Sequence, residues 1–544
     1  MKNMKTSVKY SLNILALTVG LLVFPACEKG FLDINVDPNN PTDVPLTQLL
    51  PYAELGLSNA LSMHSQGLGE PLACFTHYIV TRNNFNSYFA QGNDGAVGDP
   101  WDQLYSNSLT DLKQIIDIGT EDEAWHFVGA AQLMTAFVMG AMVDIWGDVP
   151  FREANLGAEK PYPVYDQGSA IYADLLKLAD EALANLVKPS NVRMGNSDLF
   201  FAGDAAKWQR FGNTLKLRLY NQARLTPIYD DAAVKALISG NKLMAAGTDD
   251  FEMLYGNVVS PDTRHPSFID EYTQGSPQYN ISPYFYQIMQ GKSQLNTIFK
   301  DIVDPRLPYY FYKQLTPTQP AQNAVSYRDG GFVSIWFGSL NIDPNEGFDQ
   351  NTSKTLIGLY PAGGKYDDER GGAGNLNSGL RGAGFHRMLT YFTSLYIRAE
   401  LALTRSTGEN AEALFKQAME ESFAEVNRIA TTASAPTIAK ADIDAYVGKI
   451  IALYQAADNN RKLELILTQK WIANFGFGLE AYNDVRRTGY PLPFDPKTDN
   501  NPNTELIRNF IVSFPYPTTD LQINPNAPKT QRVIAQDKVF WDVN

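Results

Sequence analysis

Amphipathic helical stripes on both sides of a turn-rich middle most constrain the fold of this 544-residue chain. Residues 121–146 place Phe127, Met134 and Phe137 at helical spacing, and 169–186 repeat the pattern. Helix pairs joined by short polar loops predict a mostly α-helical scaffold of stacked, degenerate tetratricopeptide-type hairpins. Further helices are expected at 47–64, 101–118, after an N-cap at Asp204, and at 386–404, 410–429, 439–457 and 460–474.

The middle of the chain, roughly 250–375, has a different composition. It is rich in proline and glycine, shows few helical stripes, and places 17 aromatic residues between Phe251 and Phe337. A long irregular region within a helical body is usually functional. We therefore expect the ligand-facing surface here.

The N-terminus has the pattern of a secretion signal. Lys2, Lys5 and Lys9 precede an apolar run at 12–24, which is followed by Ala26 and Cys27. A cysteine at this place predicts a lipoprotein whose Cys27 is acylated after cleavage. The alternative is an ordinary signal peptide cut near Ala26, leaving Cys27 as a thiol. The apolar run is shorter than the roughly 20 residues that span a bilayer, so lipid would be the only membrane anchor.

These patterns divide the chain into three parts. Residues 1–26 are expected to be the signal peptide, and 27–45 a lipidated tether rich in Pro, Asn and Asp. The body would be a single unit, 46–544. Within it, 46–250 and 380–544 would form the helical scaffold and 250–380 the irregular ligand face.

The net charge and the cysteine content limit which partners the protein can bind and whether it can form a disulfide. The formal net charge of −14 argues against nucleic acid and against electrostatic docking on anionic lipid. Only two cysteines are present, so a lipidated Cys27 would leave Cys74 without a disulfide partner in the chain. The apolar residues around Cys74 predict a buried, inert thiol.

Catalytic and metal-binding motifs are missing from the sequence. Its five histidines are scattered without the HExxH spacing, and there is no GxSxG elbow. The glycine-rich stretch 371–384 lacks the Lys-Ser/Thr of a phosphate loop and predicts a surface loop. The run Asp367-Asp368-Glu369 is typical of a solvated surface. We expect no enzyme activity, no cofactor and no metal.

Several segments resemble the SusD/RagB-type nutrient-binding lipoproteins of the Gram-negative outer membrane. They cover nearly the whole chain after Cys27, and their combination is more specific than any one of them. The segments are Asp33-Ile34-Asn35-Val36-Asp37-Pro38-Asn39-Asn40-Pro41-Thr42, Trp101-Asp102-Gln103-Leu104-Tyr105, Asp144-Ile145-Trp146-Gly147-Asp148-Val149-Pro150-Phe151, Gly203-Asp204-Ala205-Ala206-Lys207-Trp208, Asp304-Pro305-Arg306, Gln469-Lys470-Trp471-Ile472-Ala473 and Glu480-Ala481-Tyr482-Asn483-Asp484-Val485-Arg486-Arg487-Thr488-Gly489.

The resemblance implies a helical scaffold that docks as a lid on a SusC-like, TonB-dependent transporter barrel. It implies capture of oligosaccharides or, in some members, of peptides. The shared motifs are expected to be structural. Trp146, Gly147 and Pro150 would end a helix and turn the chain, Trp208 and Trp471 would lie in the core, and Arg486 and Arg487 would suit a helix C-terminus and a buried ion pair.

Candidate ligand contacts come from residue types that bind sugars, because aromatic faces stack on the C–H faces of pyranose rings while polar groups bind hydroxyls. The first choice is Trp336 with Phe337; the alternative is that Trp336 faces the core from a strand. Tyr284 and Tyr286 would share one face of an extended segment, with ordinary loop packing as the alternative. The aromatic run 309–312 is expected to be structural. A polar loop adds Asn83, Asn84, Asn86 and Tyr88, unless these form only a solvated turn.

The sequence thus predicts a lipid-anchored outer-membrane protein, facing the cell exterior, that binds an oligosaccharide and delivers it to a transporter. A peptide-binding member of the same family is the first alternative. The second is a helical-repeat scaffold that contacts proteins and binds no small ligand.

Overall fold

Helices with short connections form both flanks of the chain, as the stripes predict. The computed structural model describes residues 44–81, 94–273, 278–323, 325–337, 351–374, 377, 379–492 and 510–543. The first flank contains α2 (Leu46–Leu61), α3 (Gly69–Phe75), α4 (Asp94–Asp102), the π-helix η1 (Gln103–Leu109), α5 (Thr110–Glu121), α6 (Trp125–Trp146), α7 (Gly168–Asn185), α8 (Ala205–Gln222) and α9 (Asp231–Ser239).

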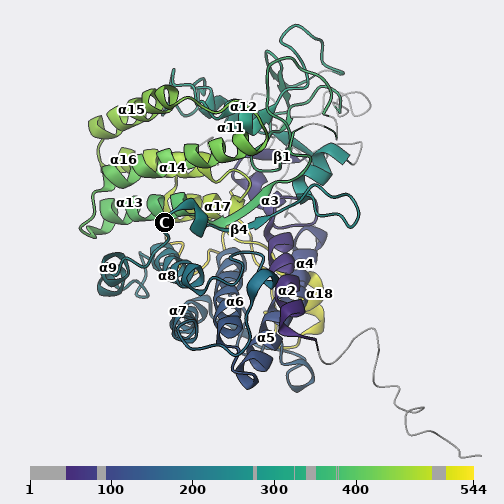
Figure 1. Ribbon diagram of the computed structural model, residues 1–544, viewed down its shortest axis with the longest axis vertical. Helices are drawn as coiled ribbons and strands as arrows, with labels where there is room; N and C mark the ends of the chain where they lie inside the picture. The colour runs from purple at the N-terminus through teal and green to yellow at the C-terminus, as the bar shows by residue number, and fades with distance from the viewer. Residues whose placement is uncertain are drawn as a thin grey trace, which may run out of the picture. The chain divides into compact units, whose positions relative to one another are not determined.

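The second flank follows the irregular middle and packs in sequence order, α13 on α14 and α14 on α15 (Figure 1). The first flank does the same, with α5 on α6, α6 on α7 and α7 on α8. Such pairwise packing of neighbours is the hairpin arrangement that was predicted. The later helices are α13 (Tyr391–Arg405), α14 (Ala411–Thr432), α15 (Lys440–Ala456), α16 (Asn459–Ala473), α17 (Gly478–Thr488) and α18 (Thr518–Ile523).

The middle is built from short helices and two-stranded antiparallel ladders. Its helices are α10 (Pro266–Phe268), η5 (Ile269–Thr273), α11 (Pro283–Met289) and α12 (Leu307–Tyr310), while short 3-10 turns η2 (Gly157–Glu159), η3 (Gly195–Ser197) and η4 (Gly247–Asp249) lie in the first flank. Its ladders pair β1 (Ile79–Thr81) with β5 (Tyr279–Ile281), β4 (Phe251–Leu254) with β10 (Phe385–Leu389), β6 (Phe311–Tyr312) with β9 (Leu356–Ile357), and β7 (Tyr327–Asp329) with β8 (Phe332–Ser334). A separate ladder in the first flank pairs β2 (Val149–Pro150) with β3 (Tyr165–Asp166).

Two helix predictions were wrong in detail. The helix expected at 386–404 begins only at Tyr391, because the residues before it pair as β10 with the distant β4 and Thr390 then caps α13. The helix expected at 101–118 is three segments, α4, η1 and α5. The extra π-helical turn is held by Asn155, whose Nδ2 donates to the carbonyl of Tyr105 (2.8 Å).

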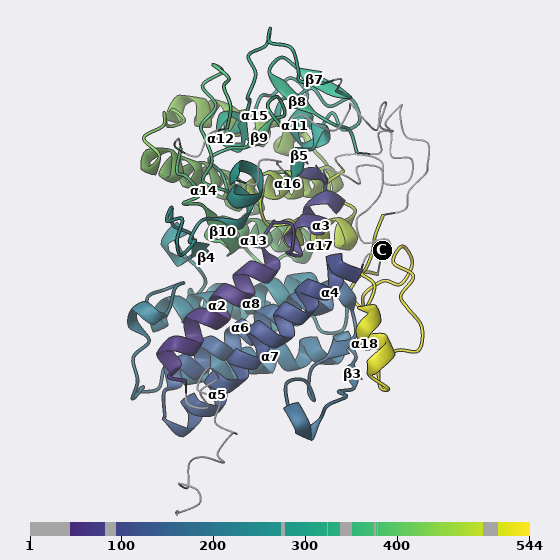
Figure 2. The same ribbon diagram turned by 90° about the vertical axis from the view of Figure 1, so that its right-hand side faces the viewer.

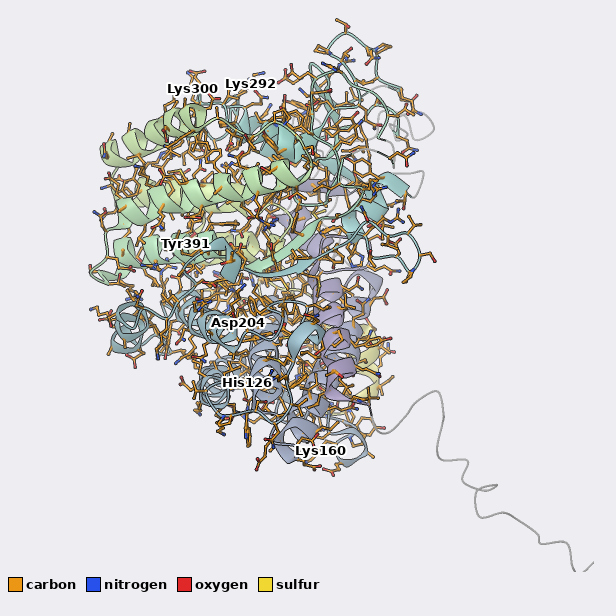
Figure 3. The ribbon with its side chains drawn as sticks, in the orientation of Figure 1. His126, Lys160, Asp204, Lys292, Lys300 and Tyr391 are labelled. Carbon is orange, nitrogen blue, oxygen red and sulfur yellow. The ribbon has the colours of Figure 1, made fainter. Side chains whose placement is uncertain are left out.

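Helix ends follow the predicted signals. Asp204, labelled in Figure 3, accepts hydrogen bonds from the backbone N–H groups of Ala206 (2.9 Å) and Lys207 (3.1 Å) at the start of α8. Helix α6 ends at Trp146, and Gly147 follows with φ of +82°, a left-handed conformation that favours glycine. The chain then turns into Pro150 of β2, so the predicted role of this motif is confirmed.

The core contains Trp208 and Trp471, as predicted, together with Trp146 at the end of α6, and the indole N–H of each has a partner. Trp208 donates to Asp198 (2.7 Å), Trp471 to the carbonyl of Thr76 (3.1 Å) and Trp146 to the carbonyl of Pro515 (2.9 Å). Cys74 and the aromatic run 309–312 are buried as expected. Helix α6 has the length and composition of a membrane span, but 94% of its most apolar window is buried inside the protein, so it is a core helix.

A buried network of four carboxylates and four cations joins the two helical flanks. Arg487 and Arg224 both bind the carboxylate of Glu400, and Arg487 also pairs with Asp484 (2.7 Å), which confirms the predicted ion pair. The guanidinium of Arg486 lies over the ring of Tyr482 (3.8 Å). The remaining pairs are Lys470 with Glu480 and Asp484, and Arg218 with Glu480 and Asp144.

Candidate functional site

Trp336 follows β8 in the loop-rich end of the protein, where Figure 2 shows β7, β8 and α11 far from α5. Its ring is half-buried, with centroids of Tyr284 and Tyr327 each 4.9 Å away. The backbone N–H of Trp336 donates to Ser326 Oγ (2.9 Å), which holds the residue against the β7–β8 hairpin. Trp336 therefore keeps part of its ring open while two tyrosines support the rest.

Tyr284 and Tyr286 lie in α11 and not in an extended segment, so the prediction that they share one face was wrong. Successive residues of a helix are about 100° apart, and two positions along point to different sides. Tyr284 is buried beneath Trp336 and meets His77 edge-on (5.4 Å). Tyr286 is also buried and stacks on Phe332 at 3.7 Å.

Phe337 is buried and packs edge-on against His77 (5.0 Å). Phe337 is therefore a core residue and not an open aromatic surface. Cys27 and the loop candidates lie outside the described residues; the latter are Asn83, Asn84, Asn86 and Tyr88.

Tyr286 adds a polar hydroxyl group to this aromatic cluster. Its hydroxyl donates to Asp329 (3.3 Å) and accepts from Gln290 Nε2 (3.1 Å). Burial, with the carboxylate of Asp329 adding to it, raises the pKa of Tyr286, so the phenol stays protonated at neutral pH. Lys292, labelled at the top of Figure 3, pairs with the same carboxylate (2.7 Å).

Tyr286 also forms part of the wall of an open cavity of about 570 Å³. The cavity lies between α11, the residues that lead into α12, and the loop 366–369. Phe311 and Tyr366 provide further aromatic surface. Its size falls within the usual range for small-ligand pockets, and aromatic walls with a few polar groups are typical of such sites.

The acidic run at this cavity was only partly predicted. Asp368 and Glu369 are exposed as expected, but Asp367 is buried and pairs with Lys313 (3.1 Å). Burial, partly offset by the charge of Lys313, raises the pKa of Asp367. Adjacent acids in a glycine-rich loop indicate solvent exposure, and the partner lysine lies 54 positions earlier in the chain, so the sequence carried no local signal of this pairing.

Further cavities lie elsewhere in the described chain. One of about 430 Å³ is bordered by Tyr391, near the centre of Figure 3, and by Asp250 and Glu252. Another of about 290 Å³ lies near Trp101 and Lys160, the latter at the bottom of the same view. Within the described ranges no group of three or more His, Cys, Asp or Glu side chains is placed to hold a metal ion.

The architecture is that of a helical-hairpin scaffold with an aromatic, loop-built face at one end. A family model described as "SusD-like_2: Starch-binding associating with outer membrane" matches residues 38–517, and the chain belongs to this family. The resemblance noted in the sequence is therefore confirmed. No match to a curated protein is found.

Solved structures share the fold over nearly their whole length. A chitin-binding protein aligns with a TM-score of 0.68 and 23% identity, covering 92% of this chain and 100% of its own. A chitin-binding SusD homolog from Flavobacterium johnsoniae gives 0.65 and 19%, with coverage of 91% and 99%. A SusD/RagB family protein from Bacteroides thetaiotaomicron gives 0.65 and 20%, with coverage of 92% and 99%. At these identities the likeness establishes the fold.

Proposed function

We propose that this protein binds an oligosaccharide at the cell surface and delivers it to a SusC-like, TonB-dependent transporter in the outer membrane. The observation that carries the proposal is the half-buried side chain of Trp336, packed against the rings of Tyr284 and Tyr327. A supported, partly open aromatic ring is the surface on which a sugar ring stacks. The family description and the chitin-binding neighbours favour a glycan as the ligand.

In this proposal the scaffold holds Trp336 rigid, because the residues behind it are buried. Tyr284 and Tyr327 then act as positioning residues that fix the plane of the indole. The loop candidates Asn83, Asn84, Asn86 and Tyr88 would bind sugar hydroxyls. Delivery to a transporter requires reversible binding, so we expect a Kd in the micromolar range or weaker, about −8 kcal/mol or less favourable.

Cys27 would be acylated and would tether the body to the outer membrane through residues 27–45. The binding face would then be turned to the cell exterior, where the transporter barrel opens. Binding without turnover is the proposed role, and no catalytic residue is assigned.

The test is a soluble protein beginning at Glu28, screened against arrays of oligosaccharides and peptides with every hit examined for cleavage. Retention of an intact glycan supports the proposal. Peptide retention would favour the peptide-binding alternative, cleavage would contradict the non-enzymatic role, and binding of neither class would favour the protein scaffold.

Substitution of Trp336 then locates the site. We expect Trp336→Ala to weaken glycan binding about tenfold or more, and Trp336→Phe to keep most of the affinity because an aromatic face remains. Trp125→Ala is the matched control: this indole is also half-buried but lies at the start of α6, under the ammonium of Lys188. Equal affinities for the Trp336→Ala and Trp125→Ala variants would refute the assignment.

A further inference from the structure

We infer that the 570 Å³ cavity beside α11 is a second sugar subsite that accepts neutral or amine-bearing units and rejects anionic ones. This inference rests on the proposed glycan-binding function and adds the charge class of its substrate. The wall of the cavity does not include Trp336, so the subsite is separate from the proposed stacking surface.

Part of the cavity lining is apolar. Pro305, Leu307 and Pro308 line it, and the ring of Tyr366 is half-buried at its edge, 5.1 Å from the buried ring of Tyr309. Tyr366 thus has a supported ring with part of its surface open, as Trp336 has. A flat ring beside proline surfaces offers a sugar the apolar contact that its C–H face requires.

The charged groups on the wall are mostly acidic. Four carboxyl groups line the cavity, against the single ammonium of Lys313. Lys313 is already engaged, because its Nζ lies 3.1 Å from Asp367 and 3.3 Å from Glu369. Burial alone would lower the pKa of Lys313, but these carboxylates outweigh it and leave the pKa above its ordinary value. The lysine is therefore charged but paired, and does not offer a free cation to a ligand.

The neighbouring arginines do not reverse this balance. Arg306 is fully buried behind the wall, where it pairs with Asp304 (2.6 Å). Arg370 is 86% exposed, lies 3.7 Å from Asp368, and is not part of the cavity lining. Asp368 and Glu369 line the cavity and keep 48% and 79% of their side-chain surface exposed, so a ligand at the cavity can reach both side chains.

Carboxylates accept hydrogen bonds from the hydroxyls of neutral sugars and attract a protonated amine. The carboxylate of a uronic acid would meet like charges within a few ångströms, which is unfavourable even at the surface. The formal net charge of −14 adds repulsion at longer range. The cavity therefore selects against anionic glycans.

Tyr286 connects the cavity to the stacking surface. It lines the cavity, and its ring centroid lies 6.4 Å from that of Tyr327, which in turn packs against Trp336. The two sites are thus neighbours on one aromatic cluster, an arrangement suited to successive units of one chain.

The test measures binding of three tetrasaccharides, of glucose, glucosamine and galacturonate, by calorimetry at pH 6 and low salt. We expect the protein to bind the glucosamine tetramer about three- to fivefold more tightly than the glucose tetramer, the range for exposed charge pairs, and to bind the galacturonate tetramer at least tenfold more weakly than glucose. Galacturonate binding as tight as glucose binding, or no binding of any tetramer, would overturn the inference.

Variants assign the preference to the cavity. Asp368→Asn/Glu369→Gln should abolish the preference for glucosamine over glucose, and Tyr366→Ala should weaken binding of both several-fold. Asp442→Asn/Asp444→Asn is the matched control, since it removes two exposed acids on α15. A preference that survives in the cavity variant, or falls equally in the control, contradicts the subsite.

The same titrations separate this inference from the proposed function. If Trp336→Ala weakens binding while the cavity variants behave like the natural protein, the stacking site stands and the subsite is wrong. If the cavity variants alone change binding, the subsite stands and the role of Trp336 is wrong. Near-isosteric amides keep the fold comparable, and circular dichroism checks this for Tyr366→Ala.

Discussion

Glu400 binds two arginines of the buried network, and Glu400→Gln tests how much these ion pairs contribute to stability. The side chain is fully buried in α13 and faces two guanidinium groups, those of Arg487 and Arg224, the latter at 2.8 Å. Asn221 donates to it as well (3.0 Å). A glutamine keeps the size of the side chain but removes the charge and turns an N–H group toward groups that can only donate.

Removal of one partner from a buried ion pair costs about 3–5 kcal/mol, because the remaining charge stays desolvated. Unfolding of the body, residues 46–544, gains about 1 kcal/mol per kelvin of entropy at the midpoint, at roughly 2.1 cal/mol/K per residue over about 500 residues. We therefore expect the Tm of Glu400→Gln to fall by about 3–5 °C in differential scanning calorimetry.

The control is Asp444→Asn in α15, which breaks the exposed pair with Lys440 (2.7 Å). Such a pair contributes about 0.5 kcal/mol or less, so the Tm should change by less than about 1 °C. Equal loss in the two variants would refute the reasoning, since burial and not pairing alone is the stated cause.

Three other perturbations have defined outcomes. Burial, with the charge of His64 adding to it, lowers the pKa of His386 from its ordinary value of 6.5 to about 3. The stability that the neutral imidazole contributes is therefore present above pH 6.5 and is lost as the pH falls toward 3. The free energy of urea unfolding should fall between pH 7.5 and pH 5 by about 2 kcal/mol less in His386→Gln than in the natural protein. Gly147→Ala forces a left-handed residue at the end of α6 and should cost about 1–2 kcal/mol in urea unfolding, whereas an unchanged midpoint would contradict the strain. Asp198→Ala removes the acceptor of three backbone N–H groups and of the Trp208 indole, so we expect a loss of at least 2 kcal/mol, and a loss no larger than that of Gly147→Ala would count against this role.

Most of the helical scaffold could be predicted because its signals are local. The stripe at 121–146, the cap at Asp204 and the glycine after Trp146 each lie within a few residues of the structure they specify. Two departures had distant causes. The first residues of the helix expected at 386–404 pair instead as β10 with β4, which lies more than 100 positions earlier. The π-helix η1 receives a hydrogen bond from the distant Asn155.

The candidate site shows the same division. An excess of aromatic residues between Phe251 and Phe337 indicated the region of the candidate site, because the composition of a segment can be read without knowing the fold. The sequence put Trp336 first but did not separate it from the other candidates: Trp336 is half-buried, while Phe337, Tyr284 and Tyr286 are buried. Exposure depends on what packs above and below a ring, and a sequence pattern does not contain that information.

The sequence by itself therefore determined the class of fold, the family and the region that carries the candidate surface. These follow from hydrophobic periodicity, helix-end signals and short motifs, all of which act over a turn or two of chain. Only the tertiary structure decided the partners of buried charges. Glu400 meets Arg224, and Lys313 meets Asp367, across long stretches of sequence. Such pairs form because folding removes both groups from water at one place, where each charge must find an opposite one.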